Sequence, residues 1–268
     1  MERRRIKIAV LGAGNVATHL ARALSDSADV VQIFSNKIEN ATLLASSISG
    51  CAATASLDDI TVDADMYLVS VKDDVIKDIA LKTAGRLCDK LWIHTSGSVP
   101  ADVFAPFAKN YGVLYPLQTF SKNVYVNVAE IPFFVEGSNV NAEFEIQKLA
   151  KSLSTVVYHA DSETRKRIHA AAVFACNFSN HLWSIAEDIL KAGDIDMSVL
   201  LPLLRTTLDK ITKVSPAEAQ TGPARRGDIG TMKKHISLLD EDKALMYKML
   251  SKSIMRQYNI SDDEQNKL

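Results

Sequence analysis

The feature that most constrains this chain is a pair of glycines between an apolar run and a helical pattern near the N-terminus. Residues 6–11 (IKIAVL) form a short apolar run rich in β-branched side chains, which Gly12-Ala13-Gly14 interrupts. Residues 16–25 (VATHLARALS) then place apolar side chains at helical spacing. A strand, a glycine turn and a helix in this order are typical of the first unit of a parallel α/β sheet with a ligand site at the turn.

Each residue of this glycine motif has a physical role in dinucleotide binding. Gly12 allows the tight turn, Gly14 lets a pyrophosphate approach the backbone, and Ala17 lets the helix pack close to the strand. The helix N-terminus adds amide donors and the positive end of the helix dipole. We expect Gly12, Gly14, Asn15 and Val16 to hold the pyrophosphate. The alternative is an ordinary strand, loop and helix with incidental glycines.

The bulk composition is that of an ordinary globular chain. The 268 residues are 47% hydrophobic and 24% charged, and the net charge of -1 gives no electrostatic reason to expect nucleic acid or an anionic membrane as a partner. The apolar stretch after Met1-Glu2-Arg3-Arg4-Arg5 is too short for a signal peptide, and no later window approaches a membrane span. The three cysteines lack Cys-x-x-Cys spacing, so we expect no metal site and a cytoplasmic, reduced protein.

The second predicted strand ends in residues that suit a phosphate. Residues 29–35 (DVVQIFS) follow the glycines by about twenty positions, where an acidic residue normally binds the ribose 2′-hydroxyl of NAD. Here Ser35, Asn36 and Lys37 follow instead, with no acid until Glu39. A hydroxyl, an amide and a cation suit a 2′-phosphate, so we expect NADP, with NAD as the alternative.

Further apolar runs predict strands that alternate at first with helices, at residues 64–71, 91–95, 112–115, 131–135 and 155–158. In an open α/β sheet, residues just past the carboxyl ends of strands line the ligand crevice. We therefore place Val71 and Lys72 beside the cofactor and expect Asp73 or Asp74 to cap the next helix.

Two later strand ends bring polar groups toward the same crevice. Ser96, Gly97 and Ser98 offer hydroxyls and free amides to a carboxylate or carbonyl oxygen, although serine and glycine are also ordinary turn residues. We expect Ser96 and Gly97 to face the nicotinamide edge. Gln118, in the loop after the strand at 112–115, joins Ser98 as a candidate substrate contact.

The composition changes near residue 160, after which helical periodicity continues without convincing strands. Residues 169–192 are Ala-rich and nearly apolar all round, as in a central or subunit-interface helix. The sequence thus predicts an α/β fold: an N-terminal Rossmann domain with a doubly wound sheet at 1–160, then an all-helical substrate and dimerisation domain at 161–268. We expect a homodimer through the helical domain.

Six motifs spread over most of the chain carry a family resemblance: GAGNVA, VSVKDD, IHTSGS, YPLQTF, HAAAVFACNF and TGPARRGD. Together they resemble a bacterial family labelled NADP oxidoreductases of the deazaflavin-dependent type, related to 6-phosphogluconate and β-hydroxyacid dehydrogenases and pyrroline-carboxylate reductase. The resemblance implies a Rossmann domain, a helical C-terminal domain and NADP-dependent hydride transfer. The family usually has histidine at the position of Tyr115.

The resemblance also implies substrate contacts in the C-terminal half. In the 6-phosphogluconate-like enzymes the first long helix of the second domain presents a lysine and, four residues on, an asparagine. Asn177 matches the asparagine, but Val173 stands at the lysine position. His169, one turn further back, can exchange a proton near neutral pH, or it caps or packs near the helix start. Arg225 and Arg226 are candidates for binding a substrate carboxylate or phosphate, or are solvated.

These observations predict an NADP(H)-dependent oxidoreductase that transfers hydride to or from a small, anionic carbonyl, imine or hydroxy compound. His169, Asn177 and Ser96 are its candidate catalytic residues. A non-catalytic dinucleotide-binding sensor or regulatory module is the alternative, favoured by the missing lysine. Reduction of a deazaflavin is a third possibility, which rests on the family label.

Overall fold

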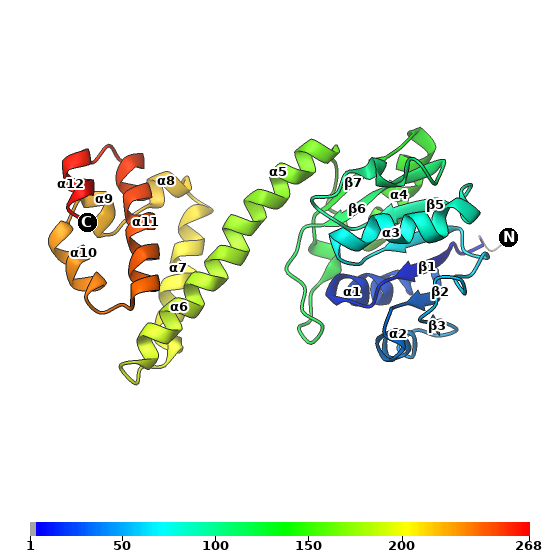
Figure 1. Cartoon of the computed structure of the whole chain (residues 1–268), viewed down its shortest axis with the longest axis horizontal. Helices are drawn as coiled ribbons and strands as arrows, with labels where there is room; N and C mark the ends of the chain where they lie inside the picture. The colour runs from blue at the N-terminus through cyan, green and yellow to red at the C-terminus, as the bar shows by residue number, and fades with distance from the viewer. Residues whose placement is uncertain (1–3) are drawn as a thin grey trace. The chain divides into compact units, whose positions relative to one another are not determined.

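The computed structural model describes residues 4–268, so the first three residues of the charged N-terminal segment lie outside the described part. The chain divides into two compact units, Met1–Cys176 and Asn177–Leu268. Figure 1 shows the strands gathered in the first unit, while the second is helical. This confirms the predicted α/β fold with a helical C-terminal part.

The first unit is built on a sheet of eight strands in the order β3-β2-β1-β4-β5-β6-β7-β8. Neighbouring strands run parallel except for the antiparallel pair of β6 and β7. The strands are β1 (Lys7–Leu11), β2 (Asp29–Phe34), β3 (Ala52–Thr54), β4 (Met66–Val69), β5 (Leu91–His94), β6 (Asn110–Pro116), β7 (Phe133–Gly137) and β8 (Val157–His159). The strand order reverses between β1 and β4, where a doubly wound sheet forms its ligand crevice.

Helices cover both faces of this sheet, which explains why its central strands are apolar throughout. On one face pack α1 (Asn15–Leu24), α2 (Ile38–Ala45) and α4 (Val140–Leu153). On the other face, α3 (Asp73–Thr83) packs near Trp92, whose ring stacks on Tyr67 with centroids 4.6 Å apart. Because both faces are buried, the sheet is a rigid platform for the loops at its carboxyl edge.

The long apolar helix expected at 169–192 begins earlier and is not a regular α-helix throughout. Helix α5 (Ser162–Ala172) continues through a π-helical segment, Val173–Phe178, into α6 (Ser179–Lys191). The earlier start follows from Asp161, whose carboxylate accepts a hydrogen bond from the Thr164 N–H at 2.8 Å and caps the helix. The change in composition at residue 160 therefore marks the end of the sheet, whereas the first compact unit extends to Cys176.

The second unit contains the remaining helices: α7 (Leu201–Ile211), α8 (Pro216–Ala219), α9 (Pro223–Arg226), α10 (Ile229–Ile236), α11 (Glu241–Gln257) and α12 (Asp262–Asn266). Its small core includes the buried residues Ala224, Met232 and Met255. The TGPARRGD motif contains α9, because Pro223 starts the helix and Gly227 ends it at a φ of 67°. None of the helices within residues 4–268 is long and apolar enough to cross a membrane.

Candidate functional site

A cleft of about 940 Å³ opens at the carboxyl edge of the sheet, within the first unit. Its lining comes from the segments that follow β1, β2, β4 and β5, from the end of β6, and from α5. This is the edge at which open α/β sheets bind their ligands, and the volume lies in the range of small-molecule sites.

The glycine turn after β1 lies between the segments after β2 and β4 and lines the cleft with them. Gly12 has a φ of 133°, and a Cβ there would overlap the carbonyl group of Ser70. Gly14 has open space within 4 Å of where its Cβ would be, and no side chain caps the N-terminus of α1. Gly14, Asn15 and Val16 line the cleft, whereas Gly12 shapes the turn behind them. The uncapped amides and the open space fit a pyrophosphate.

The residues after β2 extend the cleft along α2. Ser35 and Asn36 line it together with Asn40, which lies in α2 and which the sequence analysis missed. Lys37 is not part of the lining: it occupies the N-cap position of α2, and its N–H donates to Ser35 Oγ at 3.3 Å. Helical spacing gave no signal for Asn40, because Asn36 precedes the N-cap residue and lies outside α2.

The loop after β4 differs from the prediction in how the next helix begins. Val71 and Lys72 line the cleft. The expectation that Asp73 or Asp74 caps α3 is wrong, because α3 starts at Asp73 and Lys72 occupies the N-cap position without a side-chain cap. The Asp73 carboxylate instead accepts a hydrogen bond from the Ser98 hydroxyl. Ser98 is therefore committed to the neighbouring loop and is not part of the lining.

The turn after β5 is shaped from inside by His94. This side chain is fully buried, and its Nδ1 accepts from the Ser96 N–H at 3.1 Å while Nε2 lies 3.3 Å from the Pro100 carbonyl oxygen. Burial, together with the nearby charge of Arg165, lowers the pKa of His94 to about 3. His94 is thus a neutral, structural residue, and the turn that it holds presents Ser96 and Gly97 to the cleft.

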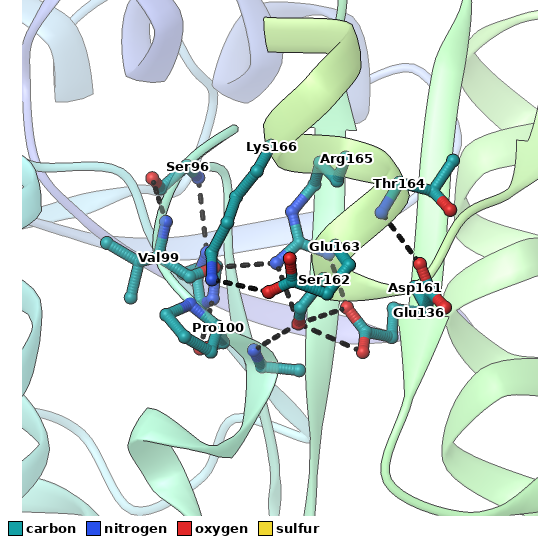
Figure 2. Close-up of polar contacts among 12 residues, drawn as sticks. Ser96, Val99, Pro100, Glu136, Asp161, Ser162, Glu163, Thr164, Arg165 and Lys166 are labelled. Atoms are coloured by element: carbon teal, nitrogen blue, oxygen red, sulfur yellow. Dashed lines mark hydrogen bonds and ion pairs between the residues drawn. The ribbon is translucent and has the colours of Figure 1, made fainter. Parts of the chain in front are cut away.

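A buried network around Arg165 connects α5 both to β7 and to the loop after β5 (Figure 2). Arg165 is fully buried, pairs with Glu136 on β7, and donates from Nη2 to the Val99 carbonyl oxygen at 2.6 Å. The Ser162 hydroxyl donates to Glu136 at 2.9 Å and accepts from the Ala101 N–H at 3.2 Å. Sequence analysis missed Arg165. The available signal was its position one helical turn before His169, which places both side chains on the same face of α5. The network fixes the first turns of α5 against the loop after β5.

His169 extends from α5 into the cleft lining, and its catalytic role stays a prediction. It lies against Gly97, and its Nδ1 lies 2.9 Å from the hydroxyl oxygen of Tyr115 on β6. Gln118 also lines the cleft, and its Oε1 accepts from the Thr119 N–H at 2.8 Å. This part of the lining therefore combines an imidazole, a phenol and an amide.

The other predicted substrate residues belong to the second unit. Asn177 lies in the π-helical segment, and Arg225 and Arg226 lie in α9. Arg225 donates to the Gln220 carbonyl oxygen, and its guanidinium lies 5.0 Å from the centroid of the Tyr258 ring. The contact of these three residues with substrate stays a prediction.

Two family descriptions match parts of the chain. Residues 7–97 match "NADP oxidoreductase coenzyme F420-dependent", and residues 131–254 match a domain of unknown function, DUF2520. The comparison with curated proteins finds no match. A crystal structure from Bacteroides fragilis named "putative NADP oxidoreductase" is 38% identical, with a TM-score of 0.87 over 94% of this chain and 98% of that one.

More distant structures share the fold. A reductive aminase from Aspergillus terreus in complex with NADPH and ethyl-5-oxohexanoate is 12% identical, with a TM-score of 0.65 over 97% of this chain and 90% of that one. An imine reductase from Myxococcus stipitatus in complex with NADP+ is 13% identical, with a TM-score of 0.64 over 93% of this chain and 92% of that one. At this level of identity the likeness is one of fold.

Proposed function

The chain belongs to the NADP oxidoreductase family in which the F420-dependent type of N-terminal domain is followed by DUF2520, and from this premise we propose that it transfers a hydride to or from a small, anionic carbonyl, imine or hydroxy compound. One observation carries the proposal. A single cleft is lined both by the amide-rich glycine turn and by the imidazole of His169. Cofactor and substrate can therefore meet within it.

NADP is the cofactor of this family, and the cleft has groups for each part of it. The amides at Gly14, Asn15 and Val16 would hold the pyrophosphate, with Val71 and Lys72 beside it. The 2′-phosphate would be bound by the residues that follow β2. These are Ser35, Asn36 and Asn40, which line the cleft, and Lys37, which flanks it. Bound NADPH supplies the hydride; the protein supplies position and a proton.

The protein's own part in the reaction is to orient the substrate and to move a proton. Ser96 and Gly97 would face the reacting edge of the nicotinamide, and His169 would donate a proton to the substrate oxygen or nitrogen during reduction. In the reverse direction the same imidazole would accept the proton. Asn177 would orient the substrate.

The anionic group of the substrate needs donors, and three of the predicted residues would supply them: Gln118 in the cleft lining, and Arg225 and Arg226 in the helical unit. The predicted contact of Ser98 is wrong for its hydroxyl, which already donates to Asp73. An arginine can bind a carboxylate or phosphate through two parallel hydrogen bonds. We therefore assign residues 161–268 to substrate binding as well as dimerisation.

A cytoplasmic homodimer is part of the proposal. The helical unit leaves many large apolar side chains exposed, among them Leu203 at 60%, Leu208 at 62% and Leu245 at 60% of their surface. Extended apolar surfaces of this kind are usually covered by another protein chain. A second copy is the simplest cover, because the same helices are available on it.

The first test is titration of the purified protein with NADPH and with NADH, following nicotinamide fluorescence. Asn36→Asp places a carboxylate where the 2′-phosphate would bind, so we expect at least about a tenfold loss of NADPH affinity with little change for NADH. Lys37→Ala should weaken NADPH binding less, since Lys37 flanks the cleft. Asn141→Asp makes the same change on α4, outside the cleft lining, and is the matched control.

Three outcomes would count against this assignment. Preference for NADH would contradict the 2′-phosphate site, and equal effects of Asn36→Asp and Asn141→Asp would contradict its location. Failure of both nucleotides to bind would contradict the cofactor assignment.

Substrates are then screened among small oxo-acids, imino acids and hydroxy acids by the loss or gain of NADPH absorbance. No turnover with any of them would contradict the proposed substrate class.

A further inference from the structure

The hydrogen bond between Tyr115 and His169 is not used by the mechanism just described. The Tyr115 hydroxyl oxygen lies 2.9 Å from His169 Nδ1, and the two rings meet edge to face with centroids 5.8 Å apart. Both residues line the cleft. The contact therefore lies where the substrate would meet a proton donor.

Tyr115 is a fixed point in this contact. It lies near the end of β6, which is paired with β5 on one side and β7 on the other, and its residue surface is only 7% exposed. Its ring packs beside Phe134, with centroids 6.3 Å apart. Because Tyr115 is held in this way, its hydroxyl group can orient the side chain of His169.

Gly97 restricts His169 from a second side. A Cβ on Gly97 would lie 2.7 Å from His169 Cγ, 2.8 Å from Nδ1 and 2.9 Å from Cβ, so the imidazole packs directly on the backbone of the turn after β5. These atoms lie near the His169 backbone, and α5 is itself anchored by Arg165. The imidazole therefore has little room to move away.

Either group could donate in this contact, because a phenol and a neutral imidazole each carry one donor and one acceptor. In the described part of the chain, however, His169 Nδ1 is the one acceptor in hydrogen-bond contact with the Tyr115 hydroxyl, so the phenol proton is satisfied inside the protein when Nδ1 accepts. Burial raises the pKa of Tyr115 to about 12, so the phenol keeps its proton and can donate it. A neutral imidazole has one N–H and one acceptor nitrogen. If Nδ1 accepts from the phenol, the ring proton is on Nε2. Within residues 4–268, the imidazole of His169 makes no other hydrogen bond.

We propose that Tyr115 is a positioning residue that fixes the proton of His169 on Nε2, so that Nε2–H is the group offered to the oxygen or nitrogen of the substrate. Gly97 supports this arrangement by leaving room for the imidazole. The last step rests on the proposed function, because it needs a substrate that accepts a hydrogen bond. The assignment of the proton to Nε2 is a property of the protein alone.

The experiment that tests this is NMR of protein labelled with ¹⁵N-histidine, at alkaline pH and without ligands. Two-bond ¹H–¹⁵N correlations distinguish a protonated ring nitrogen from an unprotonated one, and His169→Asn assigns the signals. We expect protonated Nε2 and unprotonated Nδ1 for His169. In Tyr115→Phe the signals should instead be those of a mixture of the two neutral tautomers, with the proton exchanging between Nδ1 and Nε2. Tyr111→Phe, the same change earlier on β6 and outside the cleft lining, should leave the wild-type signals unchanged.

A second variant acts from the other side of the ring. Gly97→Ala keeps the phenol but displaces the imidazole, so it should also remove the Nε2–H signature while thermal unfolding shows a folded protein. Protonated Nδ1 in the wild type, or an unchanged signature in both Tyr115→Phe and Gly97→Ala, would overturn the proposal.

Kinetics separate this proposal from the proposed function. In Tyr115→Phe we expect NADPH affinity within about twofold of wild type and, on any substrate found, a fall of about tenfold in kcat with KM nearly unchanged. A fall in NADPH affinity equal to the fall in kcat would overturn the positioning role. If the wild type turns over no substrate, the proposed function fails, and the NMR result still decides where the proton of His169 lies.

Discussion

The α-carbon of Gly12 faces the carbonyl oxygen of Ser70 so closely that a Cβ on residue 12 would overlap that oxygen. Gly12 also has a φ of 133°, a conformation that residues with a side chain rarely adopt. The turn after β1 and the loop after β4 are therefore in backbone contact. Two different requirements, space and conformation, select glycine at this position.

Gly12→Ala should accordingly destabilise the fold. The strained φ alone costs about 1–3 kcal/mol, and the overlap with Ser70 adds to it. We expect urea-induced unfolding to show a loss of at least about 2 kcal/mol. Gly14→Ala is the informative comparison, because Gly14 has a φ of −79° and open space around its Cβ position. That variant should fold normally and bind NADPH more weakly; equal stability of the two variants would contradict this account.

The buried His94 should make the fold sensitive to acid. Its pKa is about 3 in the folded protein and about 6.5 when unfolded, so between these values the unfolded chain binds the extra proton. The free energy of unfolding therefore falls as the pH falls below about 6.5. From pH 7 to 5 this group should contribute a loss of about 2 kcal/mol.

His94→Gln tests this contribution, because an amide can accept from the Ser96 N–H and donate to the Pro100 carbonyl without titrating. Urea unfolding at several pH values should give a flatter dependence for the variant than for the wild type. Parallel curves would show that His94 is not the titrating group.

Removal of Arg165 should disturb both stability and the cleft. Arg165→Met leaves the Glu136 carboxylate without its partner, and breaking a buried ion pair in this way costs about 3 kcal/mol. It also frees the Val99 carbonyl group, so the turn carrying Gly97 loses an anchor. Lys109→Met is the matched control, since its ion pair with Asp89 is exposed. We expect no measurable loss of stability there; a similar loss in both variants would contradict the special role of the buried pair.

A charge on the exposed apolar surface of the helical unit should weaken self-association. Leu203 on α7 is 60% exposed, and Leu203→Arg would place a cation in a surface that a second copy is expected to cover. Sedimentation should then show monomer at concentrations where the wild type is a dimer. Val140→Arg, on α4 of the first unit and 85% exposed, should leave the dimer intact. A wild-type monomer at all concentrations would contradict the dimer itself.

The sequence allowed the sheet and the glycine turn to be predicted because both depend on local patterns. Apolar runs between turn residues located seven of the strands, with ends shifted by a few residues, and polar residues after strands β1, β2 and β4 marked the cleft. Strand β3 is only three residues long, Ala52–Thr54, which is too short for a periodic pattern.

What could not be predicted depends on contacts between distant segments. Tyr115 and His169 are 54 positions apart, and nothing in their spacing indicates that β6 and α5 meet. The burial of Arg165 likewise depends on Glu136, which lies on a different element. Lys37 was assigned from its position in the sequence, and the backbone then placed it at the N-cap of α2, beside the cleft lining.

The hydrogen bond from Ser98 to Asp73 has a mechanical consequence. A second bond, from Thr95 Oγ1 to Ser70 Oγ at 3.1 Å, joins the same two loops, which follow β4 and β5. These two hydrogen bonds hold the loops together, so that the loops form one side of the cleft and move as a unit. A ligand that enters the cleft thus meets a preformed surface on this side and loses little affinity in ordering it.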